Sequence, residues 1–177
     1  MLNSANNEIL TRVGPGTAMG GLFRQFWQPA LLCEELPAPD CPPVRVRLMG
    51  ENFVAFRDSS GKVGLLDAHC PHRLAELFFG RNEEGGLRCV YHGWKFSVTG
   101  ELLDIPSEPA GSPMRCNPNI RAKAYPVHEA GGIVWAYLGP QECVPPLPQM
   151  EFMSLPAQNF YTSKCLMKCN YQQALEG

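Results

Sequence analysis

Two mixed pairs of metal-binding residues lie close together in the sequence. Cys70 and His72 are separated by one residue, and after sixteen further residues Cys89 and His92 are separated by two. Two thiolates and two imidazoles are soft or borderline ligands, which suit zinc or an iron–sulfur centre. Structural zinc sites usually take ligand pairs spaced as CxxC or HxxxH, and the CxH pair fits that spacing poorly.

The spacing favours delivery of the ligands to two metal atoms. Residues i and i+2 of an extended loop point the same way but stand a full strand repeat apart. We therefore expect a [2Fe-2S] cluster in which Cys70 and Cys89 hold one iron while His72 and His92 hold the other. With two ferric ions, two sulfides, two thiolates and two neutral imidazoles the cluster has no net charge, so it accepts an electron more easily than a cluster with four thiolates.

Each ligand pair lies at the end of a predicted strand. Residues 44–50 alternate apolar and polar side chains with the period of two that marks a half-buried strand. Residues 51–58 and 62–68 extend this into a three-stranded meander, with a turn at 58–61, and the meander leads directly to Cys70. Further strands are predicted at residues 87–90, 94–97, 102–105, 123–129 and 132–139, the last two joined across Ala130, Gly131 and Gly132. The pattern predicts a mainly β, antiparallel fold over residues 36–140.

The N-terminal segment, residues 1–35, reads as helical. Ser4 is expected to cap a helix that runs to about Leu10, and Thr17 is expected to cap a second helix that carries Leu22, Phe23 and Phe26.

After the β domain, residues 141–158 are rich in proline and read as a linker. Residues 159–177 then read as the start of another domain, with a strand followed by a helix that Asn170 and Gln173 open as a capping box. Because a stable domain seldom stops one turn into a helix, we expect the chain to be a fragment or a truncated gene product.

Composition narrows the function classes. The chain has 177 residues, is 45% hydrophobic and carries a net charge of −2, which gives no basic surface for a nucleic acid. Residues 1–13 lack the pattern of an export signal and no apolar run is long enough to span a membrane, so a soluble cytoplasmic protein is expected. In that compartment the eight cysteines are expected to be reduced. Those outside the ligand pairs are interpreted as small buried hydrophobic residues: Cys33, Cys41, Cys116, Cys143, Cys165 and Cys169.

The two ligand stretches, CPHR at 70–73 and CVYHGWKF at 89–96, resemble the Rieske motif. Mapped residue by residue, the resemblance places the two cysteines and two histidines on the cluster ligands. Rieske domains of respiratory complexes carry a further cysteine in each loop, and here Ala75 and Tyr91 stand in those places. The respiratory pattern also has a hydroxyl residue after the glycine, whereas Trp94 follows Gly93 here. We therefore expect an oxygenase or ferredoxin type with a midpoint potential in the lower part of the Rieske range.

Longer runs, such as residues 12–32, 44–73 and 169–177, are similar to the α subunit of Rieske non-haem iron oxygenases of the phthalate 4,5-dioxygenase-like group. The resemblance implies an antiparallel Rieske-type β-sandwich followed by an incomplete α+β catalytic domain. It also implies a reductase or ferredoxin as electron donor, an aromatic carboxylate substrate that is hydroxylated or O-demethylated, and a homotrimer.

In that family the electrons reach a mononuclear Fe(II) held by two histidines and one carboxylate. The chain is expected to lack this iron site, because its two remaining histidines, His69 and His128, lie within the β domain and are interpreted as surface residues.

Two alternatives stay open. One is a free-standing ferredoxin-type electron carrier, which would need neither the helical N-terminus nor the linker, and the other is a zinc-stabilised binding module. Beside the ligands, Tyr91 and Trp94 are candidates to shield the cluster, although Trp94 could equally be a core residue. Arg73 and Lys95 are candidates to present positive charge to an acidic electron donor.

Overall fold

The computed structural model describes residues 3–115 and 117–176, which form three antiparallel sheets. The first sheet has the order β1 (Trp27–Leu32), β11 (Ile133–Tyr137), β10 (Val127–Ala130). The second has the order β2 (Val44–Leu48), β3 (Glu51–Arg57), β4 (Val63–Asp67), β9 (Ala124–Tyr125). The third has the order β5 (Arg81–Glu83), β6 (Gly86–Arg88), β7 (Lys95–Phe96), β8 (Leu102–Asp104). The prediction of a mainly β, antiparallel fold is therefore confirmed.

Helices are few and short. The α-helices are α1 (Ser4–Thr11), α2 (Ala18–Phe23) and α3 (Tyr171–Glu176). Single 3₁₀ turns occur at η1 (Cys33–Glu35), η2 (Leu77–Phe79), η3 (Gln141–Cys143), η4 (Glu151–Ser154) and η5 (Ala157–Asn159). Within the described residues, no helix has the length and apolar character needed to cross a membrane.

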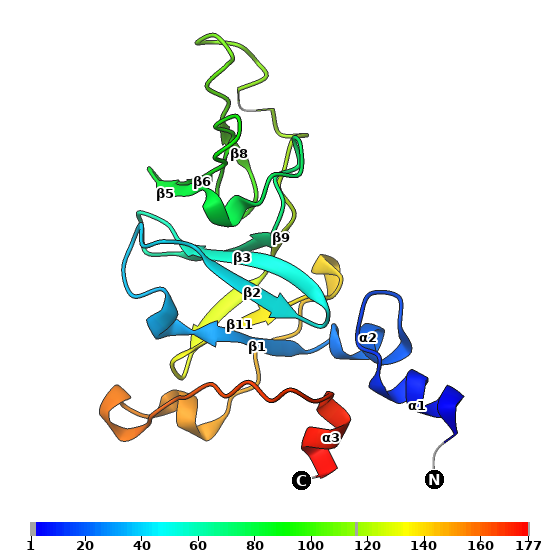
Figure 1. The fold of residues 1–177 in the computed structure, drawn as a ribbon. Helices are drawn as coiled ribbons and strands as arrows, with labels where there is room; N and C mark the ends of the chain where they lie inside the picture. Colours follow the sequence, from blue (N-terminus) through cyan, green and yellow to red (C-terminus); the bar gives the residue numbers. More distant parts are fainter. Residues whose placement is uncertain (1–2, 116, 177) are drawn as a thin grey trace.

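The sheets stack in three layers with β3 and β4 in the middle (Figure 1). Because side chains alternate along a strand, β3 sends Phe53 and Ala55 into one core and Val54 and Phe56 into another, and all four are at most 1% exposed. The first core, with Leu31 and Val134 among its members, lies against the sheet of β1, β11 and β10. The second core contains both ligand cysteines together with Leu77, Leu87 and Phe96. The middle sheet thus packs against the loops that carry the predicted ligands.

Caps at the N-terminus follow the prediction with one change. Thr17 caps α2, since its Oγ1 accepts the Gly20 N–H at 3.1 Å. For α1 the cap is Asn3 rather than Ser4, because the Asn3 side chain accepts the Asn6 N–H at 2.8 Å and Ser4 is already helical. Helix α2 ends at Phe23, so the prediction that Phe26 belongs to it was wrong.

Strand β1 lies inside the segment that the sequence predicted to be helical. Residues 27–32 pair with β11 at the edge of the first sheet, and the register shifts between Pro29 and Leu31. A proline lacks the N–H of a ladder hydrogen bond and is confined to edge strands and bulges, which explains why the local sequence gives no strand signal.

The segment after β11 crosses back over the first sheet toward the N-terminus (Figure 1). Its anchors are hydrogen bonds from the Trp27 indole to the Pro145 carbonyl at 2.8 Å and from the Thr162 hydroxyl to the Gly131 carbonyl at 3.0 Å. Lys164 pairs with Glu35 at 2.6 Å. We call residues 145–171 the strap.

The strap contains no strand at residues 159–167, so that prediction was wrong. Its contacts there are made by side chains and not by a backbone ladder. The helix predicted after Asn170 is confirmed as α3, and Asn170 Oδ1 accepts the Gln173 N–H at 3.0 Å. The Tyr171 ring packs edge-to-face on Phe23 at 4.8 Å, and its hydroxyl donates to the Leu10 carbonyl.

No disulfide joins the described cysteines in the structure. The prediction that those outside the ligand pairs are buried was wrong for the three near the end of the chain. Cys143, Cys165 and Cys169 are exposed, whereas Cys33 and Cys41 are half-buried. Cys116 lies outside the described residues.

Candidate metal centre

The two ligand stretches form loops of the same backbone design. In residues 70–75, the first ligand loop, the Cys70 N–H donates to the Ala75 carbonyl at 2.9 Å and the Leu74 N–H donates to the Cys70 carbonyl at 2.9 Å. In residues 89–94, the second ligand loop, the Cys89 N–H donates to the Trp94 carbonyl at 2.8 Å and the Gly93 N–H donates to the Cys89 carbonyl at 3.0 Å. Each loop therefore presents its cysteine first and its histidine two or three residues later from the same kind of turn.

Both loops turn through a residue in the left-handed backbone region. Leu74 has φ 56° and Gly93 has φ 74°. Glycine takes this conformation freely, whereas leucine is strained in it. The glycine is visible in the sequence as a turn signal after His92, but nothing in the sequence marks Leu74, and we missed its role.

Residues on either side of each loop pair with each other and close its base. His69 and Glu76 form an isolated antiparallel bridge below the first loop. Arg88 and Lys95 are paired in the register of β6 and β7 below the second. The side chain of Glu76 is tied in turn to Arg45 at 2.8 Å, and the Arg45 guanidinium lies over the Phe78 ring at 3.7 Å. A cavity of about 330 Å³ lies beside this base and includes His69 in its lining, but none of the predicted ligands.

The loops bring the four predicted ligands together, with the thiols inside and the imidazoles outside. Cys70 and Cys89 are 1% and 3% exposed and belong to the second core. Cys89 is close enough to Cys70 to raise the pKa of its thiol. The rings of His72 and His92 are exposed, with centroids 4.7 Å apart. A group held by all four side chains would therefore be anchored in the core and reach the protein surface at its imidazole end.

Aromatic rings flank the imidazoles. Trp94 stacks on His72 with the ring planes 1° apart and the centroids at 4.3 Å. Trp94 also packs against the second core, so the alternative interpretation of Trp94 as a core residue is supported too. Tyr91, 59% exposed, lies against His92 with a centroid separation of 3.9 Å.

The surroundings shift the pKa of Cys70 upward and the pKa of His72 downward. The net pKa of Cys70 is raised to about 11. Burial is the main cause and Cys89 adds to it, while the backbone N–H groups of His72 and Arg73 act in the opposite direction. Loss of solvation lowers the pKa of His72, and the positive charges of His92 and Arg73 add to this. The lowered pKa favours the neutral imidazole, which is the form that binds a metal.

The donor set fits a two-iron, two-sulfide cluster. Thiolates and neutral imidazoles are the ligands of such a cluster. The backbone N–H groups of His72 and Arg73 lower the pKa of Cys70 and so favour its thiolate. Within residues 3–115 and 117–176, no three His, Cys, Asp or Glu side chains gather as a site for one metal ion. A cluster that takes two ligands at each iron does not require such a group.

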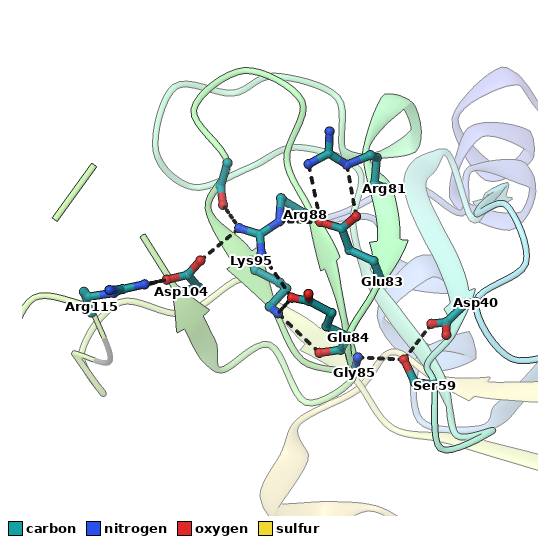
Figure 2. Close-up of polar contacts among 11 residues, drawn as sticks. Asp40, Ser59, Arg81, Glu83, Glu84, Gly85, Arg88, Lys95, Asp104 and Arg115 are labelled. Atoms are coloured by element: carbon teal, nitrogen blue, oxygen red, sulfur yellow. Dashed lines mark hydrogen bonds and ion pairs between the residues drawn. The ribbon is translucent and has the colours of Figure 1, made fainter. Parts of the chain in front are cut away.

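Charged side chains surround the base of the second ligand loop (Figure 2). Lys95 is 7% exposed and its Nζ lies 3.0 Å from Glu84 Oε2. Lys95 therefore does not present its charge to a partner protein, contrary to the prediction, because it faces inward from β7 under the turn that joins β5 and β6. Arg73 is exposed, and so are His69 and His128, as the sequence indicated.

Comparison with known proteins points to one family. Residues 26–126 match the family model of the Rieske [2Fe-2S] domain. The chain is 49% identical to the 3-chlorobenzoate-3,4-dioxygenase oxygenase subunit of Comamonas testosteroni and 44% identical to the phthalate 4,5-dioxygenase oxygenase subunit of Pseudomonas putida. Both alignments cover 100% of this chain but 40% of the relative, so the chain spans less than half the length of these proteins.

A solved structure shares the fold. An oxygenase and ferredoxin complex of carbazole 1,9a-dioxygenase matches with a TM-score of 0.60 and 30% sequence identity. The match covers 77% of this chain and 32% of that one.

Proposed function

Because the chain belongs to the Rieske [2Fe-2S] domain family, we propose that its two ligand loops hold a [2Fe-2S] cluster and that the protein transfers electrons. The observation that carries the proposal is the division of the donors, with two thiols buried in the core beside each other and two imidazoles exposed at the surface. When bound, the cluster would supply transfer of one electron at a time.

The chain's own residues prepare this site. Cys70 and Cys89 bind from the second core, where water is excluded, and hold the inner side of the group. His72 and His92 bind from the outer side, and the stacked Trp94 fixes the ring plane of His72. Because His72 and His92 are exposed, we expect electrons to pass between the site and a partner through these imidazoles.

We further propose that the protein serves as the terminal component of a ring-hydroxylating or O-demethylating oxygenase, in which electrons go on to a mononuclear non-haem iron. Support comes from the extent of the similarity, because the oxygenase subunits align with the whole chain, including the helices and the strap outside residues 26–126. The names of both relatives include an aromatic carboxylate, and we propose that class of substrate here. A reductase or ferredoxin is the proposed electron donor, and a homotrimer the proposed assembly.

Metal and sulfide analysis of the purified protein tests the cluster. We expect two irons and two acid-labile sulfides per chain, and a paramagnetic resonance signal on reduction. Cys89→Ser is expected to lose most of the iron, whereas the control Cys143→Ser, at an exposed position outside the site, retains it. Zinc without sulfide would overturn the proposal, and so would equal losses in the two variants.

The oxygenase role is tested on the complete subunit with a reductase or ferredoxin. Oxygen uptake should couple to formation of a hydroxylated or demethylated product from a benzoate or phthalate. A subunit that is reduced by the donor but turns over none of these carboxylates would contradict the substrate class, and one that only passes electrons to a soluble acceptor would favour the carrier alternative.

A further inference from the structure

The second ligand loop is crossed by the side chain of the residue that precedes it. Arg88 Nη1 donates to the Gly93 carbonyl at 2.8 Å. This contact joins the residue before Cys89 to the residue after His92, so it closes the loop from below. The first ligand loop contains Pro71, whose ring fixes its own backbone φ. The second has no proline between its ligands, and exposed Val90 and Tyr91 occupy that stretch.

The Arg88 guanidinium is itself held in one orientation. Its Nη1 lies 3.0 Å from Asp104 Oδ2 and its Nε lies 2.6 Å from Glu83 Oε1 (Figure 2). The side chain is 12% exposed. A planar guanidinium with charged partners on two edges keeps its third contact in a fixed direction.

The position of Arg88 is electrostatically unfavourable without these carboxylates. Arg88 lies directly opposite Lys95 in the β6–β7 pair, and like charges at opposed positions of a sheet destabilise it. Glu84 offsets both charges, at 3.6 Å from Arg88 and 3.0 Å from Lys95. A neutral residue at position 88 would avoid the repulsion, but it would lack the ion pairs with Glu83 and Asp104 that hold the Arg88 side chain in one orientation.

We propose that Arg88 is the positioning residue of the second ligand loop, an inference that rests on the proposed cluster. The Arg88 guanidinium holds the Gly93 carbonyl in place. Because Gly93 follows His92 directly and has the left-handed backbone conformation, this contact also limits the movement of the His92 backbone. Arg88 touches neither metal nor substrate in this role. Arg88 acts through the loop backbone, so removing its side chain should make the proposed cluster release iron faster.

Two substitutions separate the contact with the Gly93 carbonyl from the surrounding ion pairs. In Arg88→Met, Asp104 keeps Arg115, whose Nη2 lies 2.5 Å from Oδ1, and Glu83 keeps Arg81 at 3.1 Å. Neither carboxylate is orphaned, so the fold should persist, and the Gly93 carbonyl is the group that loses its partner. The control is Arg81→Met, which removes a 72% exposed arginine from the same Glu83 without touching the loop.

The measurement is release of iron from the cluster-loaded full chain to a chelator, followed by the visible absorbance, together with the paramagnetic resonance spectrum of the reduced protein. For Arg88→Met we expect release to be roughly tenfold faster, the size of effect seen when residues that orient metal ligands are removed, and a shifted spectrum. Arg81→Met should match the wild type in both.

Equal release rates and spectra for Arg88→Met and the wild type would overturn the proposal. If far-UV circular dichroism shows that Arg88→Met does not fold, Arg88→Lys decides, because it keeps the charge but lacks the fork that reaches both the carbonyl and the carboxylates. Faster release from the lysine variant supports the positioning role, and wild-type release overturns it. A wild-type protein that holds no iron and sulfide would instead contradict the proposed function.

Discussion

At the scale of single residues, burial determines which cysteine thiols can react with reagents in solution. Cys70 and Cys89 are held in the core where the loops meet, while Cys143, Cys165 and Cys169 are open to solvent. The thiolate is the reactive form of cysteine, so exposure and pKa together decide which thiols react. This difference could not be predicted from spacing, because the exposed cysteines lie in segments whose cover depends on packing between distant parts of the chain.

Cys33 provides a test of this separation. Burial, together with the negative charge and hydrogen bond of Glu129, raises the pKa of Cys33 to about 11. At about pH 8 we expect iodoacetamide to modify the three exposed cysteines and to leave Cys33 largely unmodified. Below its pKa the thiolate fraction rises about tenfold per pH unit, so modification of Cys33 should increase steadily toward pH 11. Peptide mass spectrometry of the cluster-loaded protein measures how far each cysteine has been modified.

The Glu129→Gln variant tests whether Glu129 contributes to the raised pKa of Cys33. It removes the neighbouring negative charge, so Cys33 should be modified faster than in the wild type at the same pH. Modification of Cys33 at the rate of Cys143 in the wild-type protein at about pH 8 would contradict the expectation.

At the scale of elements, the backbone of the two ligand loops sets the geometry of the site. The second loop passes through Gly93 at φ 74°, and a Cβ there would lie 2.7 Å from Pro106 Cγ. The approach of the segment after β8 thus leaves no room for a side chain at the turn.

Gly93→Ala should destabilise the protein and lower its cluster content. A non-glycine residue in the left-handed region costs about 1–2 kcal/mol, and the contact with Pro106 adds to that cost. Thermal unfolding and iron analysis measure the two effects. The control is Gly85→Ala, which has φ 78° but nothing within 4 Å of the added Cβ. Equal losses in the two variants would mean that the contact with Pro106 has no effect.

Sequence patterns predicted those elements whose signal is local. The alternation in β2, the turn at 58–61 and the Thr17 cap are all present, and the cysteine and histidine spacing led to loops that do meet. The ligand assignment itself stays a prediction. Strand β1 was missed because its pairing with β11 involves residues about a hundred positions away, and Pro29 weakens its local signal. The Arg88 contacts were missed for the same kind of reason, since Glu83 and Asp104 come from two other strands.

At the scale of the whole molecule, the strap ties the end of the chain to its beginning. It contacts the β10–β11 turn through Thr162, the region after β1 through Lys164, and α1 and α2 through Tyr171. The segment predicted as a linker and a new strand is therefore attached to the rest of the described chain at several separate points, although most of its residues are exposed.

Thr162→Val should loosen the strap locally. The variant keeps the shape of the side chain but loses the hydrogen bond to the Gly131 carbonyl, worth about 1 kcal/mol, so trypsin cleavage after Lys164 and Lys168 should become roughly fivefold faster. Thr11→Val is the control, because that hydroxyl bonds within α1 to the Asn7 carbonyl. Cleavage at an unchanged rate in Thr162→Val would show that the strap is held elsewhere.

The middle sheet has a consequence for how this chain can change over evolutionary time. Each of β3 and β4 is buried on both faces, with neighbouring residues serving different cores. Adding or deleting one residue in such a strand exchanges its two faces, so it would place Phe53 where Val54 packs and disturb both cores at once. Apolar substitutions of similar size would be tolerated there far better than any insertion or deletion. Length changes among related chains should therefore fall in the turns and in residues 106–121, and not in β3 or β4.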